Sequence, residues 1–142
     1  MKSHFPDVNV WLALNHEVHP HHLAAKTWFE TLDERSILVF CRLTQMGLFR
    51  LLSTQTVMGG EALTMQQCWR LYDQWIDGRR AELWAEPRQL ESTFREESNT
   101  VEQSPKRWSD AYLASFARQF GLTLVTFDRA LAGKTPGAVL LP

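Results

Sequence analysis

The pattern of hydrophobic and polar residues along the chain alternates between short apolar runs and stretches with helical spacing. This alternation predicts short buried strands separated by helices. Continuous apolar runs at Ser36–Phe40 and Leu122–Phe127 are typical of strands buried on both faces of a sheet. Helical spacing is clearest in a stripe formed by Met65, Cys68, Trp69, Tyr72 and Ile76. The alternation predicts an α/β fold with a short, mostly parallel central sheet flanked by helices.

Capping and turn residues predict where the other elements begin and end. Thr44 and Thr64 can each cap a helix. Ser109 can cap a further helix that carries Asp110 in its first turn. The polar residues 99–107 predict a mobile loop. The remaining expected elements are a very short strand ending near Asp7, a helix through Leu14, a helix opened by His19 and Pro20, a strand over residues 81–85 and a polar helix over residues 88–97.

The length and composition are those of a globular protein. The chain has 142 residues, of which 44% are hydrophobic and 22% charged, so we expect one domain over residues 1–142. The formal net charge is −1, so any contact with nucleic acid must be local. Cys41 and Cys68 lie in apolar segments, which predicts buried, reduced thiols.

We expect a cytoplasmic protein that does not enter a membrane. The segment from Met1 to Pro6 is too short and polar for the apolar part of a secretion signal. No apolar run of the sequence is long enough to span a bilayer.

Three aspartates that are far apart in the sequence stand where their carboxylates could reach one pocket. Asp7 and Asp128 each follow an expected strand, and ligands of open α/β sheets bind at the carboxyl ends of strands. Asp110, near a helix start, can face the same side. Mg²⁺ and similar hard cations prefer such oxygen clusters, and enzymes that cut phosphodiesters use these cations.

Taken alone, each aspartate has a structural explanation. Asp110 and Asp128 are suited to cap a helix or to interact with its dipole, and Asp7 can belong to a turn. The functional interpretation depends on all three lying at one edge of one sheet. Closely spaced carboxylates need a cation or raised pKa values to offset their repulsion.

Five segments in this order resemble the PIN-domain family, and more narrowly its VapC toxins of type II toxin–antitoxin modules. Each segment alone is a weak signal, whereas the five together are fairly specific and cover essentially the whole chain. They are Asp7–Leu14, His19–Ala25, Leu43–Leu52, Ser109–Ala114 and Thr126–Leu131.

The resemblance implies a metal-dependent ribonuclease whose Mg²⁺ or Mn²⁺ is held by Asp7, Asp110 and Asp128. It places Thr126 at a hydroxyl position that supports the site and Asn9 at a polar position near the first aspartate. In such a site, a metal ion lowers the pKa of a water molecule and neutralises charge that builds up on the phosphate. The family also implies an RNA substrate, a cognate antitoxin protein and a homodimer.

The segment around Gln45 departs from the family pattern, because many PIN domains carry a glutamate there. An amide oxygen can accept a hydrogen bond or ligate weakly, but it brings no charge. We therefore expect a second divalent ion to bind less tightly than the first. The same departure leaves an alternative open, in which the chain is an RNA- or protein-binding module with a weakened or inactive nuclease site.

Five basic residues lie near these segments, and any of them could contact RNA phosphates: Arg42, Arg50, Lys106, Arg107 and Arg129. Arg50 is favoured because it shares a segment with Gln45. An ordinary solvated charge is the competing explanation for each of them.

Other classes fit the sequence less well. A phosphatase that forms an aspartyl-phosphate needs a second aspartate two residues after Asp7, where Asn9 stands. No glycine-rich dinucleotide motif follows the first strand. The four histidines of residues 16–22 resemble a metal-binding tract, but matching ligands are missing elsewhere, so solvated side chains are expected.

Overall fold

One sheet of five parallel strands lies at the centre of the molecule. The computed structural model describes residues 3–142; Met1 and Lys2, which belong to the expected domain, lie outside the described residues. The strand order is β3-β2-β1-β4-β5, and the neighbouring strands are parallel, which confirms the expected α/β architecture. The strands are β1 (Ser3–Pro6), β2 (Ile37–Phe40), β3 (Ala81–Leu83), β4 (Thr123–Thr126) and β5 (Val139–Leu140).

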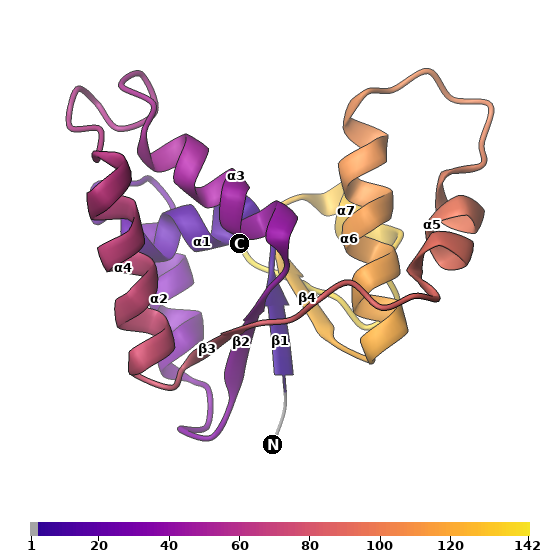
Figure 1. The fold of residues 1–142 in the computed structure, drawn as a ribbon, viewed down its shortest axis with the longest axis horizontal. Coiled ribbons are helices and arrows are strands. Elements are labelled where there is room, and N and C mark those ends of the chain that lie inside the picture. The colour runs from indigo at the N-terminus through magenta and orange to yellow at the C-terminus, as the bar shows by residue number, and fades with distance from the viewer. Residues whose placement is uncertain (1–2) are drawn as a thin grey trace.

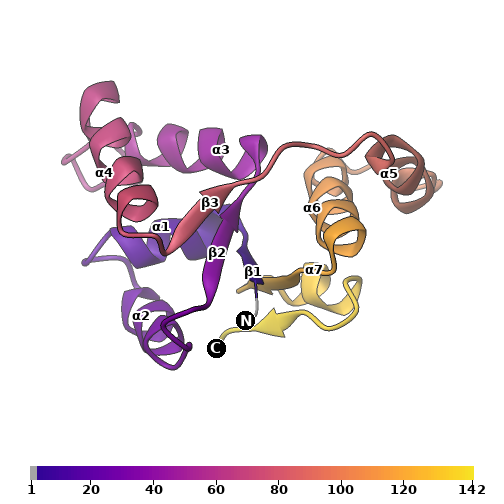
Figure 2. The ribbon, with the colours of Figure 1, turned by 60° about the horizontal axis from the view of Figure 1, so that its bottom comes forward.

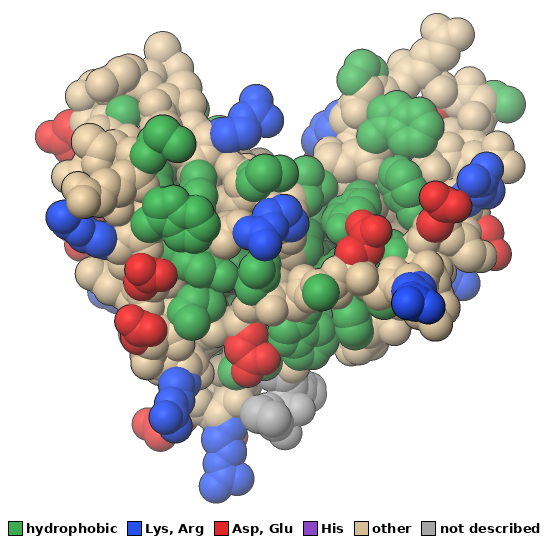
Figure 3. All heavy atoms as spheres, in the orientation of Figure 1, with side chains coloured by type: hydrophobic (Ala, Val, Ile, Leu, Met, Phe, Trp, Pro, Cys, Tyr) green, Lys and Arg blue, Asp and Glu red, His purple; other side chains and the backbone are tan. Residues whose placement is uncertain are grey.

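Helices cover both faces of the sheet (Figures 1 and 2). One face carries α1 (Val8–Asn15), α2 (His22–Glu30), α3 (Arg42–Leu52) and α4 (Met65–Asp77). The other face carries α6 (Lys106–Phe120) and α7 (Arg129–Gly133), and α5 (Leu90–Ser98) packs against α6. The two sets of helices stand apart beyond the sheet, so the surface is hollowed between them (Figure 3).

Alternate side chains of the central strands enter two different cores. Val39 of β2 packs with Phe5 of β1 and Phe116 of α6. Its neighbours Leu38 and Phe40 pack on the opposite face. Successive side chains of a strand point to opposite faces, and here both faces are covered, which explains why β2 is apolar throughout.

The core on the α1 side is built around Trp11, which is fully buried. Its ring stacks on Phe40, with centroids 3.8 Å apart, and Trp75 of α4 meets it edge-on at 5.2 Å. This packing fixes α1 against the sheet. The residue that caps α1, Asp7, is thereby fixed as well.

Two helices begin earlier than their predicted caps. The N-cap of α3 is Cys41, and Thr44 lies inside the helix, where its hydroxyl accepts a hydrogen bond from the Cys41 backbone N–H at 3.0 Å. The N-cap of α6 is Pro105, whose fixed φ suits a helix start. Asp110 consequently lies in the second turn of α6, and the end of the expected loop over residues 99–107 is helical.

Other expectations are met in part. The stripe on α4 is only partly core, because Met65 is 80% exposed and Trp69 is 47% exposed. Cys41 and Cys68 are free and buried, as predicted. The short strand β5 has no counterpart among the predicted elements. Within residues 3–142, no helix combines the length and apolar character needed to cross a membrane.

Candidate active site

Asp7 lies directly after β1, at the carboxyl end of the sheet, and is the N-cap of α1. Its Oδ1 accepts a hydrogen bond from the Val10 backbone N–H at 3.1 Å. Its backbone N–H donates to the carbonyl oxygen of Val125 at 3.0 Å, which continues the pairing of β1 with β4. The residue is only 6% exposed, so this carboxylate is held rigidly at the sheet edge.

Thr126, the last residue of β4, joins two of the aspartates. Its buried hydroxyl donates a hydrogen bond to Oδ2 of Asp7. The Thr126 hydroxyl oxygen in turn accepts a hydrogen bond from the Asp128 backbone N–H at 2.9 Å. The hydroxyl therefore sets the orientation of Asp7 and the path of the chain into Asp128 at once.

Asp128 is the N-cap of α7, and one of its oxygens has a structural role. Oδ1 accepts hydrogen bonds from the backbone N–H groups of Ala130 at 2.9 Å and Leu131 at 3.1 Å. Oδ2 instead accepts a hydrogen bond from the ammonium group of Lys106. Asp128 can therefore both cap α7 and take part in the site, because a different carboxylate oxygen is used for each role.

Asp110 faces the same place from α6. Its Oδ2 lies 3.9 Å from Nζ of Lys106, one helical turn earlier. Lys106 therefore links Asp110 with Asp128, just as Thr126 links Asp128 with Asp7. The structure brings all three predicted aspartates to one region.

Burial and neighbouring charges give the three carboxyl groups different acidities. Burial raises the pKa of Asp7, although the Thr126 hydroxyl lowers it in part, and the charge of Asp128 adds to the rise. Burial also raises the pKa of Asp110, against the influence of Lys106. The hydrogen bond from Lys106 lowers the pKa of Asp128. The same bond raises the pKa of Lys106.

The donor set fits a hard divalent cation in its chemistry, since it consists of carboxylate oxygens with a hydroxyl in support. A cationic group, the Lys106 ammonium, already lies at two of the carboxylates. As the side chains are placed, no group of three or more acidic, histidine or cysteine residues within residues 3–142 is arranged to hold one ion. The residues therefore suit a metal, but their side chains have to move to share one.

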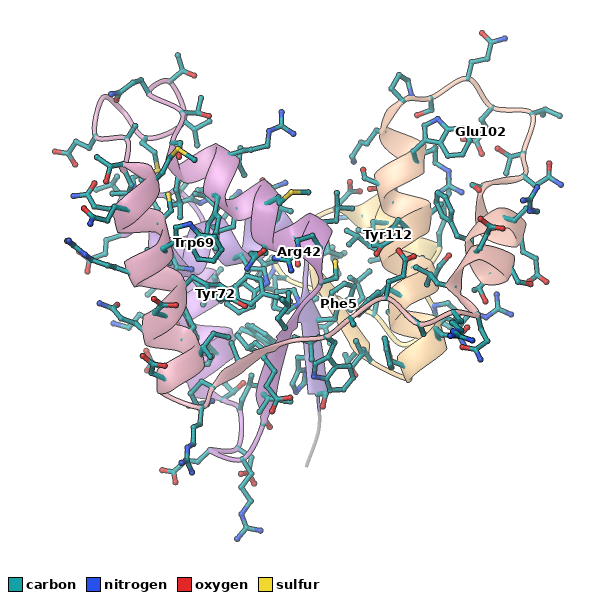
Figure 4. The ribbon with its side chains drawn as sticks, in the orientation of Figure 1. Phe5, Arg42, Trp69, Tyr72, Glu102 and Tyr112 are labelled. Carbon is teal, nitrogen blue, oxygen red and sulfur yellow. The ribbon has the colours of Figure 1, made fainter. Side chains whose placement is uncertain are left out.

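Gln45 is buried on α3, and its recorded partners are Arg42 and Tyr72. Its Oε1 accepts a hydrogen bond from the Arg42 guanidinium at 2.6 Å. Gln45 also hydrogen-bonds Tyr72 of α4 and thereby moderates the rise in pKa that burial gives that phenol. Arg42 and Tyr72 lie near each other between α3 and α4 (Figure 4). Among the described residues, no hydrogen bond joins Gln45 to Asp7, Asp110 or Asp128.

The other predicted residues lie around the site in different ways. Asn9 is exposed in the first turn of α1, and its backbone N–H bonds Asp7. Arg50 is exposed at the end of α3, beside the α4 residues Met65 and Trp69. Arg107 is turned toward α5 and the preceding loop. Its Nη2 donates to the Glu97 carbonyl at 3.2 Å, and its Nε lies 3.8 Å from Oε2 of Glu102.

The role of Lys106 as the partner of two acidic residues was missed from the sequence. The i,i+4 spacing of Lys106 and Asp110 is visible in the chain, and such a pair shares one helical face. The pairing was not predicted because the helix was expected to begin at Ser109, which placed Lys106 in a loop.

Comparison with known proteins defines the class to which this fold and site belong. The PIN domain family model matches residues 5–134, so the chain belongs to the PIN-domain family. Within that family it belongs to the VapC ribonucleases. Ribonuclease VapC41 of Mycobacterium tuberculosis is 41% identical over 128 residues, which are 87% of this chain and 88% of the relative.

Solved structures share the fold at low sequence identity. Mycobacterium tuberculosis VapC20, described as a Sarcin-Ricin loop cleaving toxin, superposes with a TM-score of 0.65 at 15% identity, covering 97% of this chain and 98% of that one. A toxin–antitoxin complex from Klebsiella pneumoniae gives a TM-score of 0.59 at 16% identity, with coverage of 96% and 95%. These likenesses support the fold.

Proposed function

We propose that this protein is a divalent-metal-dependent endoribonuclease and the toxin of a VapBC-type toxin–antitoxin pair. The observation that carries the proposal is the meeting of Asp7, Asp110 and Asp128 at the carboxyl end of β1 and β4, with one cationic side chain between two of them. Sequence identity with a VapC ribonuclease supports the reaction class.

The metal would be Mg²⁺ or Mn²⁺, held by Asp7, Asp110 and Asp128. When bound, it would supply an activated water and stabilise negative charge on the phosphate. The protein's own part is to fix the ligands. Thr126 holds Asp7 in one orientation, and the backbone N–H groups of α7 hold Oδ1 of Asp128, which leaves Oδ2 directed toward the site.

RNA is the proposed substrate, and its phosphates need cationic partners on a chain whose net charge is −1. Arg50 is an exposed candidate for such contact. Arg107 is a weaker candidate, because its side chain is only 19% exposed and is engaged by Glu102. A cognate antitoxin is part of the proposal, supported by the toxin–antitoxin complex from Klebsiella pneumoniae among the fold relatives. A homodimer and a cytoplasmic location complete the proposal and follow from the family resemblance alone.

A second candidate function is an RNA- or protein-binding module without nuclease activity. Two observations favour it. Gln45 brings no charge and is engaged by Arg42. In addition, no three potential ligands within residues 3–142 are arranged to hold one ion. This alternative predicts binding that survives loss of the aspartates and no metal-dependent cleavage.

Cleavage of RNA by the purified protein separates the two functions. The assay contains Mg²⁺ or Mn²⁺, with EDTA as a parallel condition, and compares the wild type with Asp7→Asn and Asp110→Asn. Asparagine retains the cap of α1 and so limits damage to the fold. Asp77→Asn, at the exposed end of α4, is the matched control.

The nuclease function predicts cleavage that EDTA and both site substitutions abolish while Asp77→Asn remains active. Cleavage that persists in Asp7→Asn and Asp110→Asn contradicts the proposed site. A complete absence of cleavage, together with retained RNA binding, supports the binding module instead.

A further inference from the structure

The ammonium group of Lys106 lies between two of the carboxylates assigned to the metal. It donates a hydrogen bond to Oδ2 of Asp128 and lies 3.9 Å from Oδ2 of Asp110. A divalent cation held by these residues would be bound by the same two carboxylates. The ammonium and the cation therefore compete for one place.

The two acidic side chains are largely buried, whereas the lysine side chain is largely exposed. The side chains of Asp110 and Asp128 are 12% and 25% exposed, and Asp128 is further held by two backbone N–H groups of α7. The side chain of Lys106 is 65% exposed. A lysine has a long, flexible stem, so its ammonium can swing into solvent without any change in α6.

Lys106 also offsets the repulsion between the carboxylates. It opposes the effect of burial on Asp110 and lowers the pKa of Asp128. With the ammonium in place, no three potential ligands among residues 3–142 are arranged around one ion.

We propose that Lys106 is a built-in competitor of the divalent cation, whose ammonium group bridges Asp110 and Asp128 in the metal-free protein and is displaced when the ion binds. The inference rests on the proposed function, because it requires a metal at these aspartates. The inference adds a regulatory contact to the proposed site. The affinity for the metal then depends on the acidic ligands and also on how readily the Lys106 ammonium is displaced.

Isothermal titration of the full-length protein with Mn²⁺ tests this exchange without any assay of activity. The comparison is between the wild type, Lys106→Met and Lys134→Met. Lys134 is an exposed residue after α7 whose charge lowers the pKa of Asp110, although no ion pair joins the two in the described structure. Lys134→Met therefore removes a neighbouring positive charge without removing a competitor.

If the ammonium occupies the ion's place, Lys106→Met binds Mn²⁺ about three- to fivefold more tightly, the scale of a largely exposed ion pair. Lys134→Met, which changes only a screened charge, shifts the affinity less than about twofold. An equal effect of the two substitutions, or weaker binding by Lys106→Met, overturns the inference while leaving the metal site intact. Failure of both the wild type and Lys106→Met to bind Mn²⁺ contradicts the inference and the proposed function together.

A second measurement follows the lysine itself. In protein with ¹³C-labelled lysine, the resonance of the Lys106 methylene next to Nζ is identified by its loss in Lys106→Met. Addition of Mg²⁺ is expected to move this resonance toward the position of a solvated lysine, with a smaller change for Lys134. An unmoved Lys106 resonance at saturating Mg²⁺ shows that the ammonium is not displaced and overturns the inference.

Discussion

At the scale of single residues, the hydroxyl of Thr126 organises the site. It donates a hydrogen bond to the Asp7 carboxylate and accepts one from the Asp128 backbone N–H. Asp7 and Asp128, which follow different strands, are therefore both positioned by one hydroxyl. Both interactions are local consequences of β4 ending beside β1.

Replacement of Thr126 by valine tests this role. The substitution keeps the shape but removes the hydroxyl, so Asp7 loses a donor and becomes free to turn. We expect RNA cleavage to fall about 10- to 100-fold, the usual effect of losing a group that orients a metal ligand. Thr126→Ser keeps the hydroxyl and is expected to retain most of the activity. Equal losses in both variants would assign the effect to packing.

Asp7 makes the stability of the metal-free protein depend on pH. Burial raises its folded-state pKa above the ordinary value of 3.8, so the ionised carboxylate is destabilising in the folded protein. That cost is fully present above the folded pKa and disappears as the pH falls to 3.8. We expect Asp7→Asn to raise the free energy of unfolding at pH 7 in EDTA.

The measurement is urea unfolding of both proteins in EDTA at several pH values. The advantage of Asp7→Asn is expected to shrink as the pH is lowered through the folded pKa of Asp7 toward 3.8. An advantage that is independent of pH would show that the charge of Asp7 is not its source.

At the scale of elements, the close approach of α3 to α1 positions the start of α1. Gly47 of α3 leaves no room for a side chain, because a Cβ at this position would lie 2.7 Å from Cγ2 of Val8. Val8 follows Asp7 directly and is a β-branched residue with little rotamer freedom. The packing of α3 therefore bears on the residue next to the site.

Gly47→Ala is expected to destabilise the protein by about 1–3 kcal/mol, because the added methyl group forces α3 away from Val8. Gly133→Ala in α7 is the matched control, since a Cβ there meets no atom within 4 Å. The free energy of unfolding in urea checks both. The double variant Val8→Ala/Gly47→Ala is expected to recover part of the loss, and no recovery would contradict a clash with Val8.

At the scale of the whole molecule, the site depends on cores on both faces of the sheet. Trp11 anchors α1 on one face, and Phe116 of α6 packs with Phe5 of β1 on the other. Asp7 follows β1, Asp128 caps α7 just after β4, and Asp110 lies on α6, so their meeting requires both cores.

Trp11→Ala is expected to lower the free energy of unfolding by about 3–5 kcal/mol, as other deletions of large buried aromatic residues do. Trp69→Ala is the comparison, because this tryptophan is 47% exposed and its removal should cost less, about 2 kcal/mol. Denaturant unfolding followed by circular dichroism checks both. A similar loss for the two variants would contradict the central position of Trp11.

The sequence predicted the fold better than it predicted the helix starts. The apolar runs at β2 and β4 were clear because these strands are buried on both faces. The caps of α3 and α6 were misplaced, since Thr44 and Ser109 have the side chains of N-caps but lie inside helices. Cys41 and Pro105 begin these helices instead, and neither is among the preferred cap residues.

The sequence by itself determined the α/β class, the family and the three aspartates, because hydrophobic period and local motifs are properties of the chain. Only the tertiary structure decided that Thr126 joins Asp7 to Asp128, that Gln45 turns to Arg42 and Tyr72, and that Lys106 lies between two carboxylates. These contacts depend on strand order and on the direction in which each helix presents its side chains. Such long-range geometry is not encoded in any single segment.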